Sequence, residues 1–227
     1  MEIEKILSES WKIYKKNWVT FIIAQILVSA VSFISIVILL ASLLISQSWQ
    51  WTIIFIPLSI LMILLSIGIE SGIYYLAKKG SKRKVYTKTF LEGVRKYWMK
   101  FVGTKILISL IFLFASFPLI FFVLSKIEIG IFMWLGFLFL IAPLFSIAPA
   151  AIVFNKSVIS SIKESVIIGY RNYLLILLVL FIYSIFHVVL LFLGTVGILV
   201  GELVIVPLKT ISFVLIYKYF KSKKYLS

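Results

Sequence analysis

The chain has 227 residues, of which 63% are hydrophobic and 14% charged, against roughly 45–50% and 25% in soluble domains. A soluble domain of this length cannot bury so much apolar surface, so we expect lipid to be its solvent. With no Cys, no Asp and a single His, disulfides are excluded and few metal ligands remain. We therefore predict no catalytic residue, no metal site and no cofactor. The net charge of +15 does not indicate nucleic acid, because the basic residues flank apolar stretches instead of covering a soluble fold.

Six apolar stretches follow one another along the chain. Each has about 20 residues or more, which lets a helix rising 1.5 Å per residue cross a ~30 Å hydrocarbon layer. The stretches lie at about 19–44, 52–77, 101–124, 129–154, 173–193 and 195–217. This pattern predicts an all-α integral membrane protein with one domain, residues 1–227. The short connections after the first, third and fifth stretches predict three antiparallel hairpins.

The distribution of basic residues predicts the orientation. Of the 23 Lys and Arg residues, 21 lie before the first stretch, between the second and third, between the fourth and fifth, or after the sixth, counting the edges of those segments. Lys126 lies on the opposite side and Lys209 lies inside the last stretch. By the positive-inside rule, both termini are cytoplasmic in a cell membrane. We expect the basic segments to contact the lipid bilayer at its anionic headgroups.

Similar segments precede the first, third and fifth stretches. Each begins with Glu and a small residue, ends with Asn or Lys followed by an aromatic residue, and has apolar residues at helical spacing. The three segments are Glu9–Trp18, Glu92–Phe101 and Glu164–Tyr173. Such helices are expected to lie in the headgroup plane on the cytoplasmic side. They act either as anchors that fix the entry angle of the next span or as docking surfaces for a partner or headgroup. The layout predicts three repeat units, at about 1–80, 81–155 and 156–227.

The second span of each predicted hairpin contains proline. These residues are Pro57, Pro143, Pro149 and Pro207. Proline removes a backbone donor and kinks a helix, and neighbouring helices can satisfy the freed carbonyl. The kinked spans either line a cavity, as in transporters with broken helices, or only shape the packing.

Four groups of residues carry a resemblance to a known family. The groups lie at Trp11–Trp18, Ala148–Ala150, Glu164–Tyr173 and Val206–Tyr217. Together they resemble the six-span membrane domain found beside some glycerophosphodiester phosphodiesterases and in related multi-pass membrane proteins of archaea and bacteria. In those enzymes an attached soluble barrel carries catalysis. This sequence has no segment large enough for that barrel and no counterpart of its carboxylates and histidines, so the resemblance implies the membrane fold without the phosphodiesterase activity.

Four ionisable residues inside the spans are candidate intramembrane polar sites. They are Glu70, Lys209, His187 and Glu202. An ion at the bilayer centre costs at least ~2.5–3.5 kcal/mol, so each residue needs a partner or a water-lined path. Matching depths predict an ion pair between Glu70 and Lys209 and a hydrogen bond between His187 and Glu202. The alternatives are a proton or ion site, a purely structural contact, or Lys209 extending toward the cytoplasmic surface.

Two functions stay open on the sequence. We expect a noncatalytic membrane protein that acts as a scaffold or partner-binding component, with a protein partner or a second copy on its apolar surface. The alternative is a small transporter or channel that uses the proline-containing spans and the region of Glu70 and Lys209. A cavity that reaches Glu70 or Glu202 favours the transporter, whereas a well-packed bundle favours the scaffold. An enzyme is not expected, because no nucleophile–base pair can be assembled from these residues.

Overall fold

The computed structural model describes residues 2–45, 49–125 and 127–222, and every regular element among them is a helix. The elements are α1 (Ile3–Ile45), α2 (Trp49–Gly80), α3 (Thr87–Ser125), α4 (Ile127–Phe145), α5 (Ala148–Ile152), α6 (Val158–Arg171), α7 (Tyr173–Leu191), α8 (Gly194–Val200), the π-helical turn η1 (Gly201–Ile205) and α9 (Val206–Ser222). Within these residues, six helical segments are long and apolar enough to cross a membrane: Ile3–Ala41, Ile56–Gly80, Thr87–Ser116, Met133–Ile152, Tyr173–Leu191 and Gly194–Ser222. The prediction of an all-α, multi-pass membrane protein is confirmed at this level.

The predicted fourth span, 129–154, is interrupted. Helix α4 ends at Phe145 and the short helix α5 begins at Ala148, with Pro149 in its first turn. A proline has no N–H for the carbonyl four residues earlier, here that of Phe145, and it fits best in the first turn of a new helix. Pro143 lies near the end of α4, whereas Pro57 lies within α2 without interrupting it.

Pro207 follows the π-helical turn η1 and lies at the start of α9. It cannot donate to the carbonyl of Leu203, four residues earlier. The hydroxyl of Tyr14 in α1 donates to that carbonyl at 3.0 Å. A neighbouring helix thus satisfies the backbone group that the proline leaves free, as expected for a membrane bundle.

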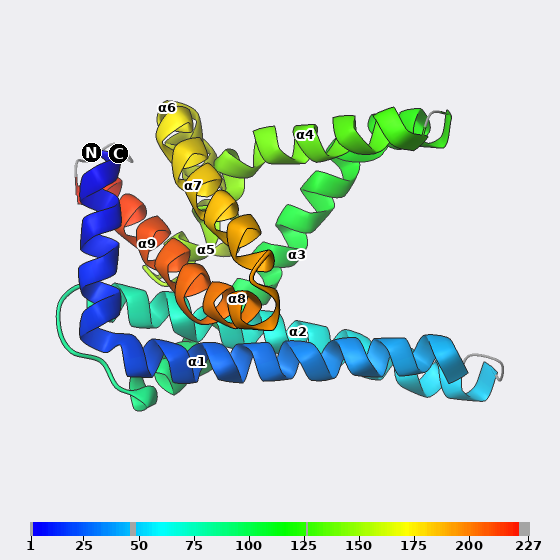
Figure 1. The fold of residues 1–227 in the computed structure, drawn as a ribbon, viewed down its shortest axis with the longest axis horizontal. Coiled ribbons are helices and arrows are strands. Elements are labelled where there is room, and N and C mark those ends of the chain that lie inside the picture. Colours follow the sequence, from blue (N-terminus) through cyan, green and yellow to red (C-terminus); the bar gives the residue numbers. More distant parts are fainter. Residues whose placement is uncertain (1, 46–48, 126, 223–227) are drawn as a thin grey trace.

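The helices lie side by side as three pairs: α1 with α2, α3 with α4, and α7 with the segment from α8 to α9 (Figure 1). The first two pairs diverge from each other with distance from the side where α1 begins and α9 ends, called here the terminal side (Figure 1). Divergence leaves large apolar side chains uncovered by protein: Phe33 in α1 is 67% exposed, for example, and Phe114 in α3 is 74% exposed. In a membrane protein such surfaces contact lipid or another protein.

The core lies where α2, α5 and α9 meet, toward the terminal side. All of α5 is buried, together with Ile73–Ala77 of α2 and Thr210–Tyr217 of α9. Small residues permit this close packing, because Ala148, Ala150 and Ala151 let the neighbouring backbones approach.

Two of the three junctions between a predicted amphipathic segment and its span are bent at asparagine. Asn17 (φ −127°, ψ 17°) and Asn172 (φ −129°, ψ 33°) have nearly the same non-helical backbone. Each side-chain amide donates to the carbonyl four residues earlier, at 3.0 Å to Ile13 and 3.1 Å to Ile168. Asparagine interrupts a helix in this way because its side chain competes for backbone partners. Lys100 occupies the equivalent position of the second segment, and α3 passes through it without a break.

The small residue after each repeated Glu lies at a close helix contact. The Ser10 hydroxyl lies 2.8 Å from that of Ser212 in α9. A Cβ atom at Gly93 would lie 2.5 Å from the Tyr75 side chain in α2, and the Ser165 hydroxyl donates to a carbonyl of α4 at 2.8 Å. The three segments therefore pack on α9, α2 and α4, respectively. The division into three repeat units stays a prediction from the sequence.

Candidate functional site

Glu70 pairs with Lys105 of α3. The Lys105 ammonium lies 3.4 Å from both carboxylate oxygens of Glu70. The pair predicted from the sequence, Glu70 with Lys209, is not formed: among the described residues, Lys105–Glu70 and Lys156–Glu164 are the ion pairs within 4.0 Å. The predicted pairing rested on the equal depth of Glu70 and Lys209 in the membrane, and equal depth does not determine which helices are neighbours.

Two glycines near Glu70 allow α3 to approach α2. A Cβ atom at Gly68 would lie 3.0 Å from the Trp98 side chain, and one at Gly72 would lie 2.5 Å from that of Phe90. These contacts identify α3 as the helix that packs closely on this part of α2. The Lys105 side chain then needs no long reach to meet the carboxylate.

Glu202, in the π-helical turn η1, accepts a hydrogen bond from the Gln25 side chain of α1 at 3.2 Å. The predicted hydrogen bond between His187 and Glu202 is not found in the described part of the chain. The His187 ring lies instead against Gly201, where a Cβ atom would be 3.1 Å from the ring. Gln25 escaped the sequence analysis because it carries no charge, although an amide inside the apolar stretch 19–44 was a signal for it.

Lys209 completes the arrangement. The carboxylates of Glu70 and Glu202 attract its ammonium, and Lys105 repels it. We call Gln25, Glu70, Lys105, His187, Glu202 and Lys209 the intramembrane polar cluster. Its members come from α1, α2, α3, α7, η1 and α9, so five of the six apolar segments contribute. Two carboxylates and two ammonium groups make the cluster neutral overall when His187 is neutral.

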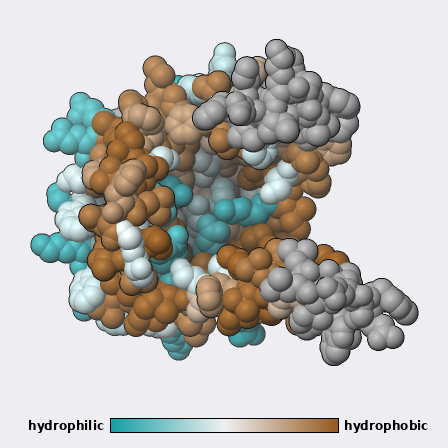
Figure 2. All heavy atoms as spheres, turned by 45° about the vertical axis from the view of Figure 1, so that its right-hand side comes forward, coloured by the Kyte–Doolittle hydropathy of each residue, from teal (hydrophilic) through white to brown (hydrophobic). Residues whose placement is uncertain are grey.

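A pocket of about 430 Å³ opens between α7 and the segment of η1 and α9. Its polar lining residues are Tyr183, Ser184, His187, Glu202 and Lys209. Three of the four intramembrane sites predicted from the sequence therefore meet in one pocket. Figure 2 shows hydrophilic residues gathered in a hollow between apolar helix pairs. The π-helical turn η1 forms part of the wall, and such turns are frequent at functional sites.

The side-chain oxygen of Gln25 has no hydrogen-bond partner among the described residues, although Gln25 is only 3% exposed. The amide nitrogen of the same side chain donates to Glu202, so the free oxygen lies close to the polar cluster. A buried acceptor without a donor is costly. A hydrogen-bond donor from a ligand or a water molecule would remove that cost.

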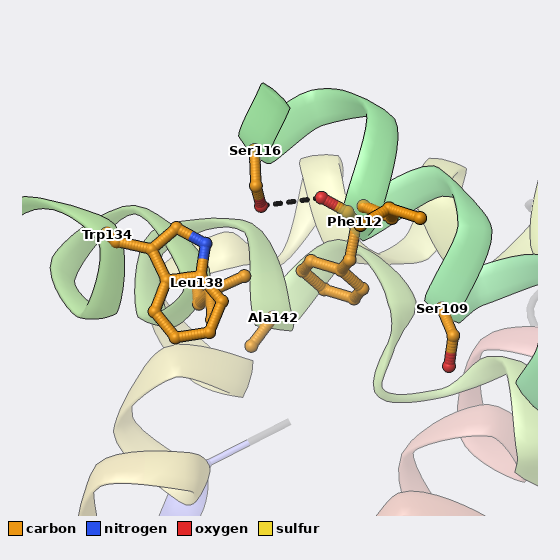
Figure 3. Close-up of a pocket in the computed structure, with 7 residues that line it drawn as sticks. Ser109, Phe112, Ser116, Trp134, Leu138 and Ala142 are labelled. Atoms are coloured by element: carbon orange, nitrogen blue, oxygen red, sulfur yellow. Dashed lines mark hydrogen bonds between the residues drawn. The ribbon is translucent and has the colours of Figure 1, made fainter. Parts of the chain in front are cut away.

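A second pocket, between α3 and α4, has a volume of about 510 Å³ and is almost entirely apolar. Phe112 extends from α3 toward it, and Trp134, Leu138 and Ala142 line it from α4 (Figure 3). The Ser116 hydroxyl is already bound to the Phe112 carbonyl at 2.6 Å. This pocket offers shape but no recognition group, and any lipid chain can fill it. The pocket beside the polar cluster is the better candidate site.

The core separates the polar cluster from the terminal side. Every residue from Ser71 to Ala77 in α2 and from Thr210 to Tyr217 in α9 is buried, and α5 packs against both helices. Seven helical residues span about 10 Å. The described residues therefore form a hollow that is closed on one side.

Comparisons with known proteins find no match among protein-family models, curated proteins or solved structures. The resemblance to the membrane domain beside glycerophosphodiester phosphodiesterases therefore stays a prediction from the sequence. Within the described ranges, no group of three or more His, Cys, Asp or Glu side chains is placed to hold a metal ion.

The pairing of Glu70 with Lys105 has a measurable consequence. In a double-mutant cycle with Glu70→Gln and Lys105→Met, we expect a coupling energy of about 0.5–1 kcal/mol, because the two groups are partly exposed. The matched cycle with Glu70→Gln and Lys209→Met should give a smaller value, since these groups lie more than 4.0 Å apart. Unfolding of the full chain in mixed micelles measures both. A larger coupling with Lys209 would restore the pairing predicted from depth.

Proposed function

We propose that this chain is a noncatalytic, multi-pass protein of the cell membrane that binds a small zwitterionic solute at the polar cluster and acts as a carrier. The observation that supports this most is the pocket lined by His187, Glu202 and Lys209 within apolar segments. In this proposal the termini are cytoplasmic, and the helix pairs are antiparallel hairpins, each introduced by an amphipathic segment on the cytoplasmic side. The fold is that of the six-span membrane domain named above.

The charges of the pocket favour a zwitterion over a simple ion. A ligand ammonium group would meet Glu202, and a carboxylate would meet Lys209, so neither charge in the pocket is left unpaired. A single ion would neutralise either Glu202 or Lys209 and leave the other charged group without a ligand partner, and an unpaired charge is costly inside a membrane.

The packed core favours a carrier over an open channel. It closes the terminal side of the hollow with side chains of α2, α5 and α9. A solute can cross only if these helices rearrange. The break between α4 and α5 and the π-helical turn η1 interrupt the regular helix of two spans, and broken helices serve such rearrangements in transporters.

The scaffold is the second candidate, and the diverging helix pairs favour it. Their exposed apolar side chains give a partner or a second copy a large surface, as Phe33 (67% exposed) and Phe114 (74% exposed) illustrate. In that case the polar cluster only fixes how the helices meet. The two candidates differ in whether water and solute reach the pocket.

Cysteine accessibility separates the candidates, because the chain contains no native Cys. Ser184→Cys places a thiol in the pocket, and Leu178→Cys places one on an exposed apolar position of the same helix. Thiols react through the thiolate, which forms in water and not in lipid. In cells or proteoliposomes, we expect a membrane-impermeant maleimide to label the pocket thiol and not the control.

Millimolar glycine betaine or L-alanine should slow the labelling of Ser184→Cys, whereas choline and acetate should not. Labelling from outside only would also agree with cytoplasmic termini. If the pocket thiol reacts no faster than Leu178→Cys, no water reaches the pocket and the carrier proposal fails in favour of the scaffold. If labelling occurs but none of the four solutes changes its rate, a small zwitterion is the wrong ligand.

A further inference from the structure

Five lysines from four segments come together on the terminal side. They are Lys78 and Lys79 at the end of α2, Lys82 after it, Lys96 in α3 and Lys221 in α9. The ammonium groups of Lys79 and Lys96 lie over the neighbouring rings of Tyr75 and Tyr97, whose centroids are 5.5 Å apart. The positive charges of the other four lysines repel the ammonium group of Lys78. We call these five residues the lysine cluster. Convergence of this kind needs a reason, because like charges in proximity oppose folding.

Aromatic rings hold the cluster in place. The ammonium groups of Lys78 and Lys221 lie 4.6 Å and 5.3 Å from the centroid of the same ring, that of Phe154. Lys78 also donates to the Val153 carbonyl at 2.5 Å. The turn that carries Phe154 is fixed by a hydrogen bond of 2.6 Å from the Tyr97 hydroxyl to the side-chain oxygen of Asn155. The site is thus built before any ligand arrives.

The few carboxylates near the lysine cluster already have other partners. None lies within 4.0 Å of any of the five ammonium groups in the described ranges. Glu92, one turn from Lys96 on α3, accepts a hydrogen bond of 2.8 Å from Tyr75. Glu164 is bound to Lys156 and Tyr217. The cluster therefore keeps a large excess of positive charge.

We propose that the lysine cluster binds the phosphate headgroup of a phospholipid that carries more than one negative charge. Phosphate oxygens suit several lysines at once. A lipid is favoured over a free phosphate because the cluster lies at the ends of two apolar helices, where basic groups attract anionic lipid. On α3 beside it, Leu91 and Met99 are exposed apolar side chains that suit acyl chains. This site is separate from the solute pocket and does not rest on the proposed carrier function.

Full-length protein in a neutral detergent tests the proposal by native mass spectrometry. The probes are phosphatidic acid, phosphatidylcholine and, for the free-phosphate source, soluble pyrophosphate. The test variant carries Lys82→Gln, Lys96→Gln and Lys221→Gln, three exposed lysines of the cluster. The control carries Lys5→Gln, Lys12→Gln and Lys16→Gln, which are exposed lysines of α1, and it removes the same charge.

We expect the unsubstituted protein to bind phosphatidic acid in preference to phosphatidylcholine. The test variant should lose about 100-fold in affinity for phosphatidic acid, and the control much less. Equal losses in both variants, or none in either, would overturn the site. Pyrophosphate that competes as strongly as phosphatidic acid would overturn the lipid source. If the triple variant is not folded by circular dichroism, Lys221→Gln alone should still lose about fivefold, and Lys221→Arg should retain binding.

Discussion

Replacing Gly169 with alanine should destabilise the protein by about 1–3 kcal/mol or more. Gly169 lies in α6 where that helix crosses the end of α4. A Cβ atom there would lie 2.6 Å from the Cα of Leu144 and 2.7 Å from the carbonyl oxygen of Pro143. Both are backbone atoms, so no side-chain rotation can relieve the overlap. A shift of the thermal or denaturant-induced unfolding of the full chain in micelles measures the effect.

Gly136→Ala is the matched control, since Gly136 lies in α4 and a Cβ atom there meets nothing within 4 Å. Alanine favours a helix by about 1 kcal/mol over glycine, so this variant should be unchanged or more stable. If Gly169→Ala proves as stable as this control, α6 does not pack closely on α4 as described. The contact matters for the proposed function because α6 packs against both α4 and α5 and so fixes the break between them, after which the buried helix α5 begins.

The spans themselves could be predicted because hydrophobic length is a local property of the sequence. Helix α7 covers Tyr173–Leu191 where 173–193 was expected. The break in the fourth span was harder to predict from the sequence, because the stretch around Ser146 and Ile147, between the end of α4 and the start of α5, stays apolar on average. Prolines marked that region, yet Pro57 marks α2 equally and that helix continues. A proline marks a position at which a helix can be interrupted, but the packing around it decides whether the helix is interrupted there.

The candidate site was found in part. Inside a membrane, ionisable residues stand out by their cost, and this signal identified Glu70, His187, Glu202 and Lys209. Their partners were harder to predict because depth does not specify helix neighbours. Lys105 was grouped with the basic residues that set the orientation, although it lies inside a candidate span and pairs with Glu70.

The lysine cluster and the π-helical turn were beyond the reach of the sequence for another reason. The five lysines come from four segments, and only the fold brings them together, with Lys78 and Lys221 over one aromatic ring. The turn η1 adds one residue to the ordinary helical repeat, so the Val206 N–H bonds to the carbonyl of Gly201, five residues earlier. A hydrophobic stretch without strong periodicity does not reveal such an offset.

Tyr14→Phe should cost about 1–3 kcal/mol of stability, although it removes a single oxygen atom. Tyr14 is buried, and its hydroxyl donates to the Leu203 carbonyl, which Pro207 cannot serve. Without that donor, the carbonyl is left unpaired in an apolar bundle, where no water replaces it. Tyr170→Phe is the control: Tyr170 is 80% exposed, and its loss of a hydroxyl should change stability by less than about 0.5 kcal/mol.

The second substitution Pro207→Ala tests the cause of that cost. Alanine at this position supplies the N–H that proline lacks, so the Leu203 carbonyl regains a backbone donor when Tyr14 can no longer provide one. We expect the double variant Tyr14→Phe with Pro207→Ala to lose less stability than the sum of the two single variants, by about 1 kcal/mol. Strictly additive losses would mean that the hydroxyl of Tyr14 does not compensate for the proline. A positive coupling would show that α1 stabilises the irregular turn beside Glu202, and would thereby tie the first helix to the wall of the pocket.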